Sequence, residues 1–264
     1  FGGTPQEVEK LRALGLYKAV DYLVDFYRQP APNVPFEAAP PAPPTDPLEA
    51  KLRMPGVRGR VGGERTAGLG GDIGALRRAW LKRMVESQRP LQEKLTLFWH
   101  GHFATQISVV GNTYATYYQN QLFREHAAGS FGGLLYGLVH DPVMIRFLDN
   151  NTNVKGHANE NLAREIMEQF AMGVDQGYTE KDIREAARAL TGYTFDVRTG
   201  HFRFVANQHD EGPKTVFGQT GNWTGDDLVN LILQQPSTSR LVARKLFEFF
   251  AYQDPGSETV DRLS

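Results

Sequence analysis

The sequence contains no cysteine. This absence excludes a disulfide framework, thiolate-ligated zinc or iron–sulfur clusters, a cysteine nucleophile and thioether-attached haem. It does not fix the compartment, because an exported protein without disulfides and a cytosolic protein can both lack cysteine. A chain of 264 residues can fold without such cross-links, since the fraction of surface that folding buries rises with chain length.

The sequence also lacks an excess of charge of either sign and any long apolar run. Lys and Arg number 29 against 30 Asp and Glu, which argues against a nucleic-acid partner, because a domain that binds one is usually basic. No apolar run approaches the ~18 residues of a transmembrane segment. The phosphate-binding Gly-Lys-Ser/Thr loop, the Gly-x-Ser-x-Gly elbow and the His-Glu-x-x-His zinc helix are missing. No catalytic signature is therefore complete.

Helical patterns fill most of the sequence. A capping box, Thr4-Pro5-Gln6-Glu7, opens two short amphipathic helices before residue 30. From Asp72 onward, helical spacing of apolar residues recurs as far as residue 252, with one interruption. Residues 193–206 alternate apolar and polar side chains around Arg198-Thr199-Gly200, which predicts a β-hairpin. We expect a mainly α fold: a multi-helix, bundle-like globular domain with one small β-hairpin.

Proline is concentrated in one segment. Residues 30–47 hold eight of the 15 prolines, which predicts an extended strap without helix or sheet ladder. The Gly- and Arg-rich residues 54–71 predict a loop. The domains expected are an N-terminal helical segment at 1–29, the strap and loop at 30–71, and a main helical domain at 72–264. The start at Phe1 rather than Met and the stop after an apolar helical pattern indicate a fragment whose main domain continues.

Two histidines lie in the apolar segment 97–103. On one helix His100 and His102 point roughly 200° apart, so they can share a metal only if the helix breaks between them. The alternative is one buried, hydrogen-bonded histidine and one on a polar face. Because Phe98 and Trp99 flank the pair, we expect at least one of the two to be mostly buried and hydrogen-bonded.

Five asparagines occur within residues 150–161. Asparagine is a poor helix former and a good cap and turn residue. The cluster therefore indicates either a loop held by side-chain hydrogen bonds or a set of oxygen ligands for a hard cation such as Ca²⁺. No EF-hand loop is present to decide between the two.

Residues 159–172 follow as a predicted helix. Its core face is expected to hold four apolar side chains: Leu162, Ile166, Met167 and Phe170. An opposite stripe contains Asn161, Glu165 and Glu168, and Glu160 forms an i, i+4 pair with Arg164. The stripe alone is typical of a solvated helix face.

The next helix, which begins at Thr179, places Arg184, Arg188 and Thr191 on one side. Arg188 could pair with nearby surface acids or clamp a carboxylate. A short Gly-containing connection predicts that this helix packs antiparallel to the preceding one. We therefore predict a salt bridge from Arg188 to Glu165 or Glu168.

A Gly/Pro loop carries His209 and Asp210. The two could supply a metal ligand, or a general base with its orienting acid. Adjacent residues seldom face the same point, so a role with a single partner is expected for one of the two.

Together these segments resemble a bacterial family, the domain of unknown function 1800 family. The resemblance is carried in order by FGGTPQEVEKL, FWHGHFAT, NQLFREHAAGSFGGLL, DPVMIRFLDN, NENLAREIMEQFAMG, YTEKDIREAARALTG and HDEGPKTVFGQTG. It implies a mostly helical, often exported protein, periplasmic or at the cell surface, commonly encoded beside an exported sulfatase-like protein. It implies no established reaction. The motif residues that it marks as candidates are His100, His102, Asp149, Asn159, Glu160, Asn161, Arg164, Glu165, Glu168, Arg188, His209 and Asp210.

Two functions remain open at this point. In the first, the protein is an exported enzyme, a metal-dependent or acid–base hydrolase or oxidoreductase with its site between helices. A divalent metal would then be held by N and O ligands from among His100, His102, Glu165 and His209. In the second, which we favour, the polar residues form a buried network that fixes helix packing in a structural or interaction subunit at the cell envelope. Its partner would be the co-encoded sulfatase-like protein or a larger envelope complex.

Overall fold

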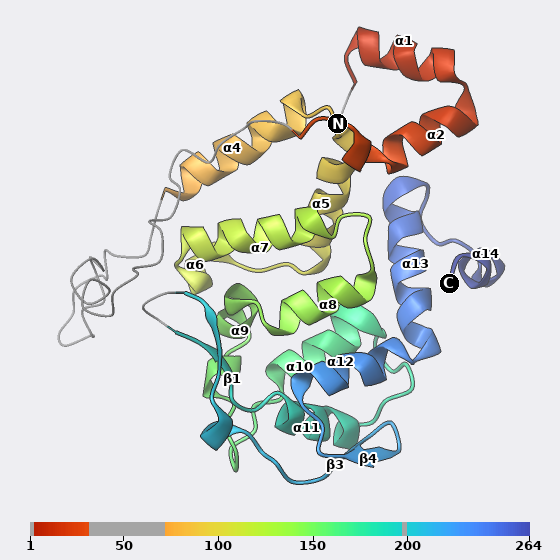
Figure 1. The fold of residues 1–264 in the computed structure, drawn as a ribbon. Helices are drawn as coiled ribbons and strands as arrows, with labels where there is room; N and C mark the ends of the chain where they lie inside the picture. The colour runs from red at the N-terminus through yellow and green to blue at the C-terminus, as the bar shows by residue number, and fades with distance from the viewer. Residues whose placement is uncertain (1–2, 32–71, 197–199) are drawn as a thin grey trace. The chain divides into compact units, whose positions relative to one another are not determined.

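A computed structural model describes residues 3–31, 72–196 and 200–264 of the protein. The chain forms two compact units, one from residues 1–101 and 111–129 and the other from residues 102–110 and 130–264. Figure 1 labels the elements of both. Nearly all of the predicted strap at 30–47, and the whole loop at 54–71, lie outside the described residues. The expected main domain of 72–264 contributes to both units.

All the regular elements described in the first unit are helices. Its elements are α1 (Pro5–Leu14), α2 (Leu16–Val24), the short 3-10 helix η1 (Phe26–Arg28), α4 (Ile73–Glu86), α5 (Pro90–His102, all but its last residue) and α7 (Thr113–Glu125). The predicted capping box is confirmed, since Thr4 and Glu7 each accept a hydrogen bond from the other's backbone. The core of this unit contains Phe26, Leu76, Leu95, Phe98, Trp99 and Phe123.

The second unit contains the remaining elements. They are α6 (Ile107–Val110), α8 (Phe131–Val139), α9 (Pro142–Phe147), η2 (Asn150–Thr152), α10 (Asn161–Glu165), the π-helix η3 (Ile166–Ala171), α11 (Glu180–Ala189), β1 (Tyr193–Phe195), β2 (Phe202–Phe204), η4 (Ala206–Gln208), β3 (Lys214–Val216), β4 (Gln219–Gly221), α12 (Gly225–Leu233), α13 (Pro236–Phe250) and α14 (Ser257–Leu263). In Figure 1, α11 lies between α10 and the β3–β4 hairpin. The prediction of a mainly α fold is confirmed.

The strands form two separate antiparallel hairpins. The predicted one is confirmed as β1 and β2, in which Tyr193 pairs with Phe204. The second, β3 and β4, was not predicted. Its strands have only three residues each, and its turn places Phe217 and Gly218 at φ 49° and 76°. Positive φ at both positions suits a tight hairpin turn, but Phe-Gly lacks the Asn or Asp that usually signals one.

The helix predicted for residues 159–172 changes type along its length. Its first turn, α10, is α-helical, and from Ile166 to Ala171 the backbone is a π-helix. Leu162, Ile166 and Met167 are completely buried and Phe170 is 5% exposed, so the predicted core face is confirmed. The π segment was not predicted, because apolar spacing does not distinguish it from a regular helix over so few residues.

No helix within the described ranges combines the length and the apolar character that crossing a membrane would require.

Candidate functional site

The asparagine-rich loop is held by side-chain hydrogen bonds. The Asn150 amide donates to the carbonyl oxygens of Leu190 and Tyr193, at 3.2 and 2.9 Å. The Asn153 amide donates to Asn150 Oδ1 at 3.0 Å and to the Ala187 carbonyl at 2.9 Å. Both asparagines are buried, at 1% exposure. They therefore tie η2 to the end of α11.

The amide oxygens of Asn153 and Asn159 also accept hydrogen bonds within this loop. Asn153 Oδ1 accepts from the backbone N–H of Asn159, and Asn159 Oδ1 accepts from that of Asn161, both at 3.0 Å. Asp149 is exposed, and its backbone is in the left-handed conformation, with φ 55°. Its carbonyl oxygen accepts a hydrogen bond from the Thr152 hydroxyl. Of the two alternatives left open by the sequence, these bonds match the loop held by its own side chains rather than a set of cation ligands.

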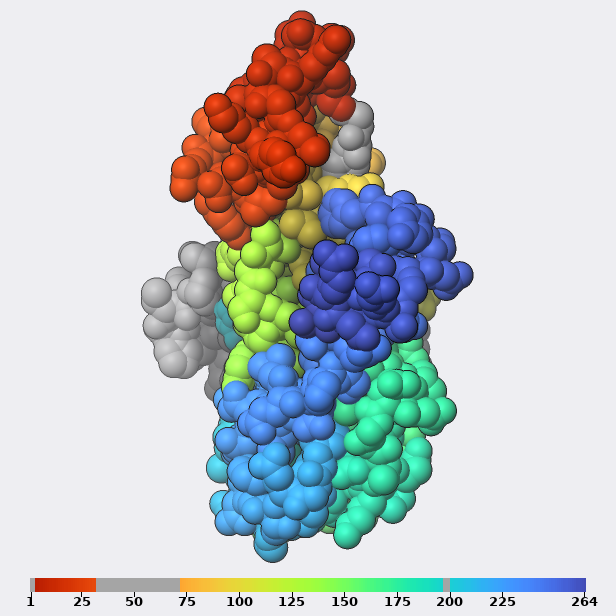
Figure 2. Space-filling model, turned by 90° about the vertical axis from the view of Figure 1, so that its right-hand side faces the viewer, coloured from red at the N-terminus to blue at the C-terminus, as the bar shows by residue number. Residues whose placement is uncertain are grey.

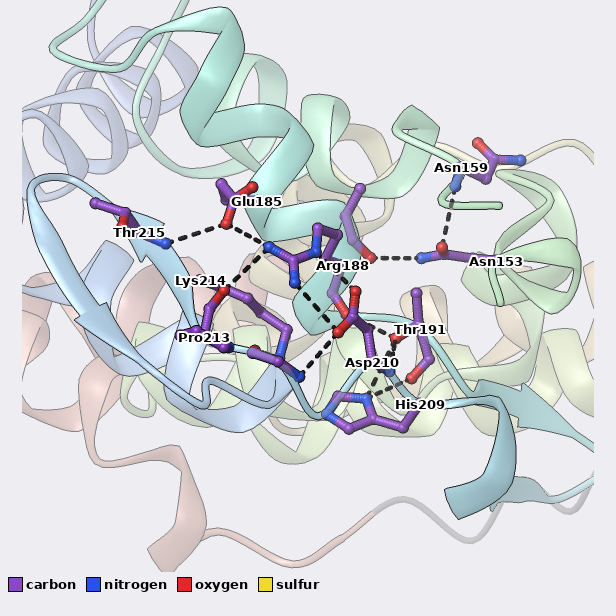
Figure 3. A network of polar contacts seen from close by, with 12 residues as sticks. Asn153, Asn159, Glu185, Arg188, Thr191, His209, Asp210, Pro213, Lys214 and Thr215 are labelled. Atoms are coloured by element: carbon purple, nitrogen blue, oxygen red, sulfur yellow. Dashed lines mark hydrogen bonds and ion pairs between the residues drawn. The ribbon is translucent and has the colours of Figure 1, made fainter. Parts of the chain in front are cut away.

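Arg188 on α11 forms the centre of a second network (Figure 3). Its Nε and Nη2 donate to Asp210 Oδ2 and Oδ1 at 2.7 and 3.2 Å, which is a bidentate pair. Its Nη1 donates to Glu185 Oε2 at 2.7 Å and to the Pro213 carbonyl at 3.1 Å. The guanidinium lowers the pKa of the Asp210 carboxyl to about 2, with help from the Gly212 N–H.

His209 and Asp210 have separate partners, in keeping with the expectation that adjacent residues face different points. His209 is 7% exposed, and its Nδ1 lies 2.8 Å from the carbonyl oxygen of Thr191. The Thr191 hydroxyl in turn accepts from the Asp210 N–H at 2.8 Å. The buried Lys214 ammonium donates to the Gly212 carbonyl at 3.1 Å, and burial lowers its pKa. The network thus joins the end of α11 to the loop before β3.

Arg164 on α10 is surrounded by three carboxylates. It pairs with Glu160 at 3.0 Å, with Glu168 at 3.2 Å and with Glu180 of α11 at 2.8 Å. The expected Glu160–Arg164 pair is therefore present. Glu165 is half-buried. Its pKa is raised, mainly by burial and to a smaller extent by the negative charge of Glu168.

The predicted salt bridge from Arg188 to Glu165 or Glu168 is wrong. Glu168 lies one helical turn from Arg164 and pairs with it. Arg188 lies at the other end of α11, where the loop before β3 brings Asp210 to its guanidinium. The partner of Arg188 thus comes from a loop 22 residues further along the chain and not from the preceding helix.

The two histidines of segment 97–103 have different surroundings. His100 packs edge-on against Trp80, with ring centroids 5.1 Å apart, and burial lowers its pKa. His102 is partly buried, and its Nε2 lies 2.8 Å from the Phe170 carbonyl oxygen. Burial, and then the charge of Lys245, lower its pKa to about 4. The expectation that one of the pair is largely buried and hydrogen-bonded is met by His102.

A metal centre would need several of the candidate ligands together. Across residues 3–31, 72–196 and 200–264, no three His, Asp or Glu side chains gather in a way that could hold a metal ion. The four candidates, His100, His102, Glu165 and His209, thus form no such group there.

The sequence matches the family described as "Protein of unknown function (DUF1800)" over residues 1–264. The chain belongs to this family. No curated protein matches it. No solved structure matches it either.

One polar cluster in this DUF1800 chain was missed at the sequence level. Glu93 on α5 is completely buried, and Arg124 of α7 holds it in a bidentate pair at 2.9 and 3.1 Å. Arg83 of α4 donates to the same carboxylate at 2.5 Å, and the Trp80 indole at 3.2 Å. The Asn120 amide oxygen accepts from Arg124 at 2.7 Å. A single glutamate in a helix is exposed by default, so nothing marked Glu93 as different.

Two cavities lie away from the candidate residues. One, of about 540 Å³, lies in the second unit between residues 172–177 and the first half of α13. The other, of about 460 Å³, lies in the first unit between the α1–α2 hairpin and the α4–α5 corner. None of the twelve candidates marked by the family motifs lines either cavity. The side chains of Asn159, Arg164, Arg188, His209 and Asp210 bond to other side chains or to the backbone.

Proposed function

We propose that this chain is a non-catalytic structural and interaction module of an exported protein, located in the periplasm or at the cell surface. In this proposal the family's polar motif residues fix the packing of short helices and loops. The observation that carries it is that Arg188, Asp210, His209 and Asn153 bond to one another and to the backbone, outside both of these cavities.

The energetics of buried polar groups support this role. Each hydrogen bond to a charged group contributes about 1.5–3 kcal/mol, and an orphaned partner costs about as much. Arg188 joins α11 to Asp210 and to the Pro213 carbonyl, and Asn153 joins η2 to α11. Loops without a regular ladder of backbone bonds depend on such contacts for a single conformation.

The first unit supplies the surface for interaction in this proposal. Large apolar side chains on α2 are strongly exposed: Leu16 by 74%, Tyr17 by 84%, Val20 by 49% and Val24 by 48%. Contiguous apolar exposure is typical of a protein-binding site. We assign this face to a protein partner, the exported sulfatase-like protein that the family resemblance implies is encoded beside it.

The test is direct binding between the two purified proteins, measured by isothermal titration calorimetry. Tyr17→Ser should weaken binding at least tenfold, because truncated aromatic anchors commonly cost more than 1 kcal/mol. Tyr118→Ser is the matched control in the same unit, since Tyr118 is also exposed, by 51%, but lies on α7. Absence of any complex, or equal losses for the two variants, would contradict the interaction role.

One observation favours the alternative of an exported hydrolase or oxidoreductase. Glu165, whose pKa is raised, directly precedes a π-helix, and π segments are frequent at functional sites. A metal analysis of the purified protein, together with turnover of ester and phosphate-ester substrates, would test it. Activity that Glu165→Gln abolishes and that Gln169→Glu, its exposed neighbour, leaves unchanged would favour the enzyme.

A further inference from the structure

The cavity of about 540 Å³ in the second unit has the dimensions of a small-molecule site. One wall is the segment that follows the π-helix, with Val174 and Gln176, and the other is the first half of α13, with Ser237 and Leu241. Figure 2 shows α13 and α14, in blue, beside the turquoise surface of the earlier part of this unit. None of the twelve candidate residues marked by the family motifs lines this cavity.

The charges of this cavity have one sign. Arg240 and Arg244 line it and are both exposed, and its lining contains no Asp or Glu. The two arginines are spaced i, i+4, so they lie one above the other on the same face of α13. Like charges at this spacing destabilise a helix by a few tenths of a kcal/mol. An anion placed between them would remove that repulsion.

The chain itself provides a carboxylate for one of these arginines. Arg240 pairs with Asp261 of α14. Within the described part of the chain, no acidic side chain pairs with Arg244. One guanidinium therefore already holds a carboxylate from a neighbouring helix, and the other faces the cavity with its donors available.

We propose that this cavity binds a small carboxylate with a short apolar body. Arg244 forms the main bond to the carboxylate, because guanidinium and carboxylate match as planar, bidentate partners. The apolar body packs against Val174 and Leu241. Asp261 competes for Arg240, so α14 carries an internal carboxylate that lowers the affinity for the ligand.

The experiment uses the whole chain and hexanoate as the probe, with binding followed by NMR of the arginine Nε–H groups and by calorimetry. Hexanoate should bind saturably, and Arg244→Gln should weaken binding roughly 10- to 100-fold, which corresponds to the loss of a charge-assisted hydrogen bond. Arg146→Gln is the matched control, because Arg146 is exposed on α9 and does not line the cavity. This variant should bind hexanoate as the unmodified chain does.

Two further measurements test the finer parts of the proposal. Asp261→Asn should bind hexanoate several-fold more tightly, because it removes the competing carboxylate. Acetate should bind several-fold more weakly than hexanoate, since it lacks the apolar body.

Several results would overturn the proposal. One is the absence of saturable hexanoate binding up to roughly 10 mM, tenfold weaker than the 1 mM affinity that corresponds to about −4.1 kcal/mol. The others are equal losses in Arg244→Gln and Arg146→Gln, and weaker binding by Asp261→Asn. Tighter binding of inorganic phosphate than of hexanoate would assign the cavity to phosphate instead.

Discussion

Two ion clusters of this chain have central groups of opposite charge. In the first unit one carboxylate, Glu93, is held by the guanidinium groups of Arg83 and Arg124. In the second unit one guanidinium, Arg164, is held by three carboxylates. The side chains of Glu93 and Arg124 are 0% and 5% exposed, whereas that of Arg164 is 32% exposed.

This difference in burial determines what each cluster contributes. Exposed ion pairs contribute about 0–1 kcal/mol, because water screens the charges and the long side chains lose freedom. Breaking a buried pair costs about 3–5 kcal/mol, since it leaves a charge in the interior without a partner. We therefore expect the exposed cluster at Arg164 to contribute less to stability than the buried cluster at Glu93.

Glu93→Gln should have the largest effect. It keeps the shape of the side chain but leaves Arg83 and Arg124 without a counter-charge, so the free energy of unfolding should fall by about 3–5 kcal/mol. Urea unfolding would measure it. Glu86→Gln, on the exposed end of α4, should change stability by less than about 0.5 kcal/mol. Equal values for the two variants would show that burial does not separate the clusters.

Phe170→Ala tests what stabilises the segment beside the Arg164 cluster. Phe170 is 5% exposed in the core of the second unit, and deleting a buried phenylalanine costs about 3–5 kcal/mol. We expect a clearly lowered thermal midpoint. Val174→Ala, at an exposed position, is the control. An unchanged midpoint in Phe170→Ala would mean that packing does not hold this helix.

His102 should make stability depend on pH. Its pKa in the folded chain is about 4, below the usual 6.5. As the pH falls from 6.5 towards 4, the unfolded chain takes up a proton and the folded chain does not, so stability decreases. In His102→Gln the decrease between pH 7 and pH 4.5 should be smaller by about 2 kcal/mol. Unfolding curves at both pH values measure this, and an identical decrease in the variant would refute it.

Arg164→Ala should have the smallest effect. Although it removes three ion pairs, their exposure predicts a loss of less than about 1 kcal/mol. Equilibrium unfolding in urea at low and high salt would measure it, and salt should reduce the loss further. A loss above about 2 kcal/mol would place this cluster with Glu93 and remove the contrast between the two.

Local patterns predicted most of the fold. The capping box at Thr4 and the helix that begins at Thr179 are confirmed, because a cap depends on residues within one turn. The first β-hairpin followed from alternation of side chains. The β3–β4 hairpin and the π-helix were missed, since short strands and a changed helical pitch leave little trace in residue types.

The candidate site was predicted only in part. The segments that carry the polar residues were found, and the Asn-rich loop holds itself together as one alternative anticipated. The partner of Arg188 was not predicted, because Asp210 reaches it from a loop 22 residues away. Pairing across such a separation depends on the tertiary fold, which charge and spacing along a single helix do not contain.

We expect the pairing of Arg188 with Asp210 to stabilise the fold. A double-mutant cycle between Arg188→Gln and Asp210→Asn, measured by urea unfolding, tests this expectation. The bidentate pair predicts a coupling energy of about 1–3 kcal/mol, with the double variant less destabilised than the sum of the single ones. A coupling below about 0.5 kcal/mol would contradict this expectation and show that the pair does not hold the fold.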